Sequence, residues 1–236
     1  MISSDLFGGF DPALVARIQA GNAQHKAEQA KARAVRTSNR HAVRRAKAEA
    51  ELATLLPERI EDGDSWHVIS HGNIDALSYL RHLLKPMYFD YVGVSTWCIA
   101  RQDLTEIASW LDAGRIDQFA LYAGEIFRNQ YGDEYEMVQR MREDYGVHFV
   151  MAKNHSKVTL CANHAEGYYV VVESSANVNT NPRIEQACVT RSRELFEFYR
   201  EFFDGLKSID REGEAARAAN VITFPRALAP APVEGD

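Results

Sequence analysis

Residues 147–157 read VHFVMAKNHSK, and they join a strand-like apolar run to a polar motif. Within the motif, His155 and Lys157 lie two positions apart. In an extended segment, residues at this spacing project to the same face of a strand. The next apolar run, GYYVVVE, is expected to return as the neighbouring strand and to bring Ser175 and Asn177 alongside. We therefore predict that these four side chains converge on one point.

Strand and helix patterns alternate on both sides of this stretch. Apolar residues at three- and four-residue spacing predict helices, and short apolar runs predict strands. The predicted helices span residues 73–85, 103–113, 134–145 and 193–207, and the predicted strands before the motif span 88–100, 118–123 and 147–152. This βαβαβ order, followed by a hairpin-like pair and a last helix, predicts an α/β sandwich: a mixed sheet flanked by helices.

The charge of the chain is unevenly distributed. Overall it is −6, yet residues 15–56 carry nine basic and three acidic residues and so contribute +6, which leaves −12 for the rest. We predict a largely helical basic arm over residues 1–60, a globular α/β domain over 65–208 and a disordered Ala- and Pro-rich tail over 209–236. The arm is too polar to bury much surface against a core. Its candidate nucleic-acid contacts are Lys31, Arg33, Arg36, Arg40, Arg44, Arg45 and Lys47.

The residue types of the motif suit phosphodiester chemistry, which needs charge neutralisation, a nucleophile and an acid for the leaving oxygen. Lys157 can neutralise phosphoryl oxygens, and Ser175 and Asn177 can donate hydrogen bonds to them. His155 can attack phosphorus as a neutral imidazole, while Glu185 can accept the other ring proton of an imidazole. Lysines supply the positive charge, so we predict neither a metal nor a cofactor.

At these residues the chain resembles the phospholipase D superfamily. That family's HxK motif corresponds to His155-Ser156-Lys157, and its GSxN segment corresponds to residues 174–177, where Ser174 replaces the glycine. Glu185 occupies the place of the family's later acid. One departure is clear, because the motif aspartate would fall at position 162, which is Ala162. The resemblance covers residues 88–205, about half of the chain.

The resemblance implies a site built from two HxK motifs, one histidine attacking and the other acting as general acid. This chain has a single HxK motif, so the resemblance implies a homodimer in which each subunit contributes one His155. The expected activity is that of a metal-independent nuclease, a phosphodiesterase that cleaves DNA or RNA through a phosphohistidine.

Two alternatives stay open. Ala162 motivates the first, a catalytically weak or inactive nucleic-acid-binding protein on the same fold. The second is a lipid phosphodiesterase or phosphatidyltransferase, which would need an apolar entry that the sequence does not display. Without an apolar run of about eighteen residues or a secretory signal, we expect a cytoplasmic protein with no stable membrane insertion. Cys98, Cys161 and Cys188 are then expected to be buried, reduced thiols.

Overall fold

The computed structural model describes residues 13, 40–72, 74–178 and 183–210. The chain divides into two compact units, residues 1–39 and 40–236, and nearly all described residues belong to the second. The tail from residue 211 onward, and the basic residues Lys31, Arg33 and Arg36, lie outside the described residues.

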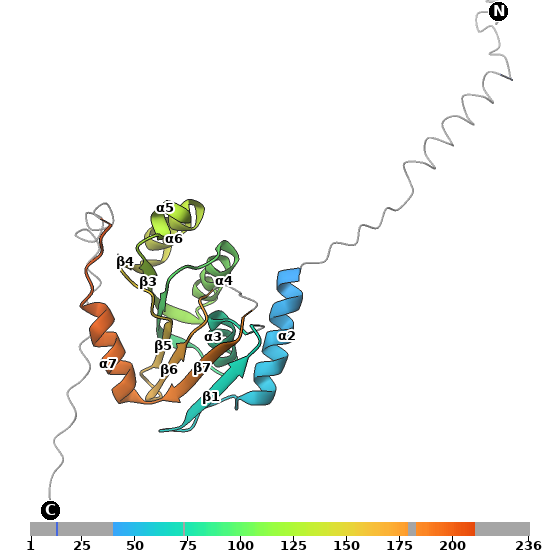
Figure 1. The fold of residues 1–236 in the computed structure, drawn as a ribbon, viewed down its shortest axis with the longest axis vertical. Coiled ribbons are helices and arrows are strands. Elements are labelled where there is room, and N and C mark those ends of the chain that lie inside the picture. The colour runs from blue at the N-terminus through green and yellow to red at the C-terminus, as the bar shows by residue number, and fades with distance from the viewer. Residues whose placement is uncertain (1–12, 14–39, 73, 179–182, 211–236) are drawn as a thin grey trace, which may run out of the picture. The chain divides into compact units, whose positions relative to one another are not determined.

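A seven-stranded mixed sheet forms the centre of the second unit, in the order β1-β7-β6-β5-β2-β3-β4 (Figure 1). Strands β2, β3 and β4 are parallel to one another, and every other neighbouring pair is antiparallel. The strands are β1 (Ser65–Ser70), β2 (Phe89–Thr96), β3 (Ile116–Gly124), β4 (His148–Ala152), β5 (Val158–Asn163), β6 (Tyr168–Ser174) and β7 (Glu185–Arg191). The predicted fold class, a mixed sheet flanked by helices, is confirmed.

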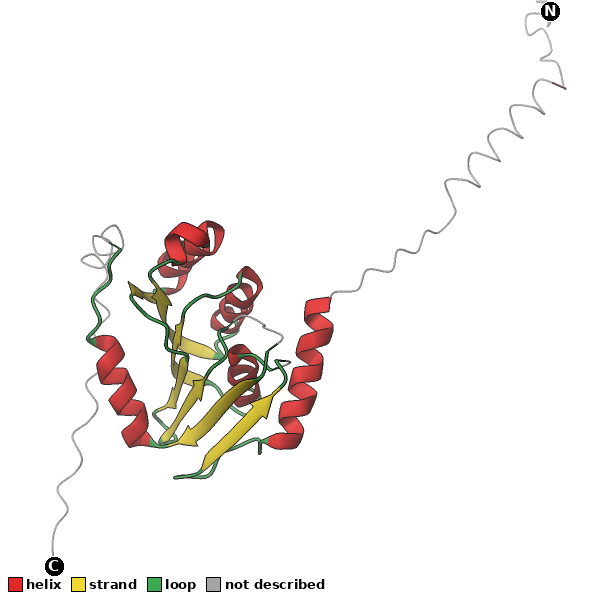
Figure 2. Ribbon diagram, in the orientation of Figure 1, coloured by secondary structure: helices red, strands yellow, loops and turns green. Residues whose placement is uncertain are grey.

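Helices lie on both sides of this sheet (Figure 2). The described helices are α2 (Arg40–Leu55), α3 (Ala76–Leu84), α4 (Arg101–Asp112), α5 (Phe127–Gln130), α6 (Gly132–Tyr145) and α7 (Arg193–Asp204). Their ends follow local rules. Asp75 caps α3 by accepting a 2.8 Å hydrogen bond from the Ser78 amide, Ser192 caps α7 in the same way, and Gly146 ends α6 in the left-handed conformation.

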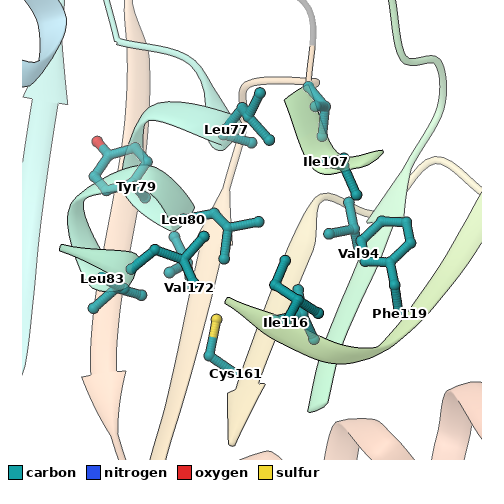
Figure 3. Close-up of a cluster of buried hydrophobic side chains, with 14 of the residues drawn as sticks. Leu77, Tyr79, Leu80, Leu83, Val94, Ile107, Ile116, Phe119, Cys161 and Val172 are labelled. Carbon is teal, nitrogen blue, oxygen red and sulfur yellow. The ribbon is translucent and has the colours of Figure 1, made fainter. Parts of the chain in front are cut away.

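Two hydrophobic clusters hold the layers together, one on each face of the sheet. The larger cluster packs α2, α3, α4 and α6 against one face, and Figure 3 shows part of it, with Leu80 beside Val172 and Val94 beside Phe119. The smaller cluster packs α7 against the other face through Phe196 and Phe203. Because α7 covers β5 and β6, the same face of β7 and β1 lacks a helical cover among the described elements.

Two parts of the fold differ from the sequence prediction. Strands β1 and β7 were missed, because each exposes most of one face and neither contains a continuous apolar run. Helix α2 is also not purely polar: Ala48, Leu52 and Leu56 recur every four residues and are buried against the body. Arg81 of α3 holds α2 further through an ion pair with Glu49. The end of the predicted arm is therefore part of the globular unit.

Candidate functional site

One end of the sheet gathers the residues that the sequence singled out. The parallel strands β2, β3 and β4 have their carboxyl ends there, and in open α/β sheets this is where ligands commonly bind. The connection from β4 to β5 carries His155 and Lys157. The last residues of β6 lead into Ser175 and Asn177, and β7 begins at Glu185. Antiparallel pairing of β5, β6 and β7 places these segments side by side.

His155 and Lys157 lie in this connection rather than within a strand, which corrects the prediction that they share a strand face. They nevertheless meet. The Lys157 Nζ lies 2.9 Å from Nδ1 and 3.2 Å from Nε2 of His155, and 2.5 Å from the His155 carbonyl oxygen. Lys157 is anchored next to β6, because its own carbonyl oxygen accepts a 2.9 Å hydrogen bond from the Ser174 amide.

The electrostatics of Lys157 set it apart from a surface lysine. Burial lowers the pKa of Lys157 below its ordinary value, while the nearby Cys98 and Glu185 act in the opposite direction. An ammonium that is poorly hydrated and close to an imidazole is stabilised electrostatically when an anion binds beside it. The arrangement is therefore suited to receiving a phosphoryl oxygen.

Ser175 and Glu185 form the second half of the site. The Ser175 hydroxyl donates a short hydrogen bond to Glu185 Oε2 and accepts one of 3.0 Å from the Gln186 amide. Glu185 thus bonds Ser175, and among the described residues it forms no hydrogen bond with His155. The side-chain oxygen of Asn177 is buried without a hydrogen-bond partner. A buried polar atom of this kind is costly unless a ligand or water satisfies it.

Sequence reasoning missed Asn154, which holds the motif in place. Its side-chain amide donates to Ser95 Oγ at 2.9 Å and to the Tyr122 carbonyl oxygen at 2.8 Å. Its side-chain oxygen accepts hydrogen bonds from the Ser156 amide at 3.0 Å and the Ser156 hydroxyl at 2.7 Å. Asn154 thereby ties the loop to β2 and β3. The sequence did contain a signal for this role, because Asn154 directly precedes the motif and asparagine side chains commonly form hydrogen bonds with nearby backbone.

Trp97, which directly follows β2, also contacts the site. Its ring centroid lies 5.7 Å from that of His155. Gly124 allows this approach, because a Cβ at this position would lie 2.5 Å from Trp97 Cδ1 and 2.9 Å from its carbonyl oxygen. No sequence pattern linked the end of β2 to His155, so only the folded chain reveals this contact.

Ala162, at the position of the family's motif aspartate, lies away from this site. It is fully buried in the smaller cluster near Tyr91 and Tyr169. It also follows Lys157 by five residues along β5, a separation of roughly 16 Å in a strand. An aspartate there would reach into the packing under α7, so Ala162 removes no group from the immediate surroundings of Lys157.

The remaining predicted residues belong to the basic arm. Lys47 is exposed on α2, and Arg40, Arg44 and Arg45 belong to the same helix. Among the described residues, no three His, Cys, Asp or Glu side chains are grouped as a metal site requires. No described helix has both the length and the apolar character needed to span a membrane.

No family model and no curated protein matches the chain. Among solved structures, polyphosphate kinase from Porphyromonas gingivalis is similar, with a TM-score of 0.46 and 17% identity over 66% of this chain and 30% of the kinase. TrmBL2, an archaeal chromatin protein that binds DNA, is similar with a TM-score of 0.45 and 12% identity over 83% of this chain and 68% of that protein. The chain thus spans less than a third of the kinase.

Proposed function

We propose that this protein is a metal-independent phosphodiesterase that cleaves nucleic acid at a site shared by two subunits. The observation that carries the proposal is the pairing of Lys157 with His155 at the end of the sheet where Ser175, Asn177 and Glu185 also lie. An imidazole beside a fixed cation, with neutral donors close by, matches what an in-line attack on phosphorus requires.

The proposed reaction has two steps that balance. In the first, a ring nitrogen of His155 attacks phosphorus, and the bond from phosphorus to the leaving oxygen breaks. The imidazolium of His155 of the partner subunit gives its proton to that oxygen. In the second step this imidazole takes a proton from water, the water oxygen attacks phosphorus, and the bond from phosphorus to the first His155 breaks. The two Lys157 ammonium groups neutralise the phosphoryl oxygens throughout.

Nucleic acid is the proposed substrate class because of the basic arm. The net charge of +6 over residues 15–56 of an otherwise acidic chain can bind a polyanion and release its counterions. Residues that hold phosphates by charge alone confer affinity without sequence specificity. We therefore expect binding that weakens steeply as salt is added.

Cleavage of a labelled oligonucleotide in EDTA, by the wild-type protein and by His155→Ala, tests the proposal. We expect activity in EDTA and none in the variant. Activity abolished by EDTA, or retained in the variant, would overturn the mechanism. Salt-sensitive binding without turnover would instead support the nucleic-acid-binding alternative, and head-group release from phospholipid vesicles without oligonucleotide cleavage would support the lipid alternative.

Asn154→Ala is expected to reduce kcat by about 10- to 100-fold, because small misplacements of reacting groups are costly. The substitution removes four hydrogen bonds that position the HxK loop. Steady-state hydrolysis of an oligonucleotide measures the effect, and circular dichroism reports on folding. Asn129→Ala in α5 is the matched control, since Asn129 is exposed. Equal rates for the two variants would show that Asn154 does not position the motif.

The affinity for phosphate is expected to fall as pH rises, and to do so at a lower pH than it would for a lysine of ordinary pKa. Binding needs the ammonium form, so it is complete below the pKa of Lys157 and is lost as pH rises through that pKa, which burial lowers. A titration of phosphate binding between about pH 7 and pH 10 tests this. Lys157→Arg should flatten the profile, because a guanidinium stays protonated. An unchanged profile in that variant would assign the titration to another group.

A further inference from the structure

A groove adjoins the proposed phosphate site on the face of the sheet that α7 leaves uncovered. Its volume is about 590 Å³, within the range of small-molecule sites, and Ser175 is one of its lining residues. Residues of β1, β6 and β7 form it: His67, Val68, Ile69, Glu173, Ser174, Ser175, Gln186, Ala187 and Cys188. The groove therefore begins where the phosphate would be held.

Strand register arranges the floor of the groove in two rows. Glu173, Cys188 and His67 are direct cross-strand partners on three neighbouring strands, and they form one row. Gln186 and Ile69 are partners in the next row, where the Ser175 amide bonds the Gln186 carbonyl oxygen at 2.9 Å. Side chains two residues apart on a strand share a face and are separated by about 7 Å. A nucleotide spans this distance from its phosphate to its base.

The chemistry of the groove favours a neutral, hydrogen-bonding ligand over more phosphate. None of the described residues that line it is a lysine or arginine, and the Glu173 carboxylate would repel a second phosphate. One Glu173 oxygen accepts a hydrogen bond from the Tyr199 hydroxyl, which leaves Oε2 as an acceptor. Burial and this bond raise the pKa of Tyr199 to about 12, so the phenol remains a donor.

Two further side chains suit a planar base. The Gln186 side-chain amide is exposed, makes no hydrogen bond to another described residue, and can both donate and accept. Ile69, whose exposed fraction is 76%, offers an apolar surface for the face of a ring. The Glu173 carboxylate can accept a hydrogen bond from an exocyclic amine, and the Gln186 amide can both donate to and accept from a base. Proteins use these pairings for the edges of cytosine and adenine, so the groove favours a base with an exocyclic amine.

We propose that this β1/β6/β7 groove is a nucleobase subsite, which binds the base attached to the phosphate held at Lys157 and Ser175 and prefers a base with an exocyclic amine. This inference rests on the proposed function, because the groove is assigned to the same substrate. It adds a specificity that the basic arm cannot provide.

Cys188 provides a readout that needs no turnover. Its thiol lies on the groove floor, 3.9 Å from His67 Nε2, and it is partly exposed, whereas Cys98 and Cys161 are buried. The full chain would be alkylated with iodoacetamide, and the modification of Cys188 followed by peptide mass spectrometry. The probes are cytidine 5′-monophosphate, uridine 5′-monophosphate and inorganic phosphate.

We expect cytidine monophosphate to slow alkylation of Cys188 at least about fivefold and inorganic phosphate to leave it unchanged. Uridine monophosphate, which has an oxygen in place of the amine, should need about tenfold higher concentration. Glu173→Gln should abolish this difference, because an amide can donate to that oxygen. Gln186→Ala should weaken protection by both nucleotides, and Gln118→Ala, in β3 at the other end of the sheet, should not.

Equal protection by inorganic phosphate, or no protection by either nucleotide, would overturn the subsite. Undiminished protection in Gln186→Ala, or a preference for cytidine monophosphate that persists in Glu173→Gln, would do the same. Nucleotide protection in a protein that cleaves no phosphodiester would support the subsite while contradicting the proposed chemistry, so failure of the two proposals can be told apart.

Discussion

His155→Asn is expected to lower the rate of phosphodiester hydrolysis by about 10⁴-fold or more, because the substitution removes both the nucleophile and the acid of a shared site. Asparagine keeps polarity and much of the volume, so a folding defect is not expected from an exposed residue. Oligonucleotide cleavage under single-turnover conditions measures the loss. His164→Asn is the matched control, since His164 lies in the turn after β5, at the opposite end of the sheet.

Mixing wild-type and His155→Asn subunits tests whether two subunits share one active site. If each site needs one His155 from both subunits, a dimer of one wild-type and one variant chain has no complete pair. An equal mixture that has exchanged fully should then retain about one quarter of the wild-type activity, against about one half for independent sites. Retention of one half, or a monomeric protein in sedimentation, would contradict the shared site.

Phe196→Ala is expected to reduce the free energy of unfolding by about 3–5 kcal/mol. Phe196 is fully buried and anchors α7 to the sheet, with ring centroids 5.9 Å from Tyr91 and 5.3 Å from Tyr169. Removing the ring leaves a cavity that the sheet cannot close. Since domains are commonly stable by only about 5–15 kcal/mol, this change should be evident in urea denaturation followed by circular dichroism.

The control for this prediction lies two residues further along α7. Phe198 has an exposed fraction of 64%, so Phe198→Ala makes the same chemical change in the same helix without emptying the core. Its effect should stay within about 0.5 kcal/mol. Similar losses for the two variants would mean that α7 contributes through its helical propensity, and not through the packing of Phe196.

Local patterns in the sequence were sufficient for the central part of the fold. Helices α3, α4, α6 and α7 and strands β2, β3 and β4 each carry an apolar period of their own, and a period depends only on nearby residues. The end strands β1 and β7 carry no such signal, because their pattern depends on which face other elements cover. For the same reason the sequence did not indicate the buried side of α2. Ala48, Leu52 and Leu56 are too few to form a clear apolar pattern, and their burial depends on the surface against which they pack.

The candidate site divides in a similar way. Residue chemistry and the HxK motif were sufficient to identify the candidate side chains His155, Lys157, Ser175, Asn177 and Glu185. The presence of a single HxK motif was sufficient for the hypothesis that two subunits share the site. Tertiary structure decided how they meet: Lys157 bonds His155, while Glu185 bonds Ser175. It also decided what surrounds them, including Asn154, Trp97 and the groove across β1, β6 and β7. A motif records residue types that lie close in sequence, whereas these contacts arise from antiparallel pairing and loop closure between distant segments, which no local pattern encodes.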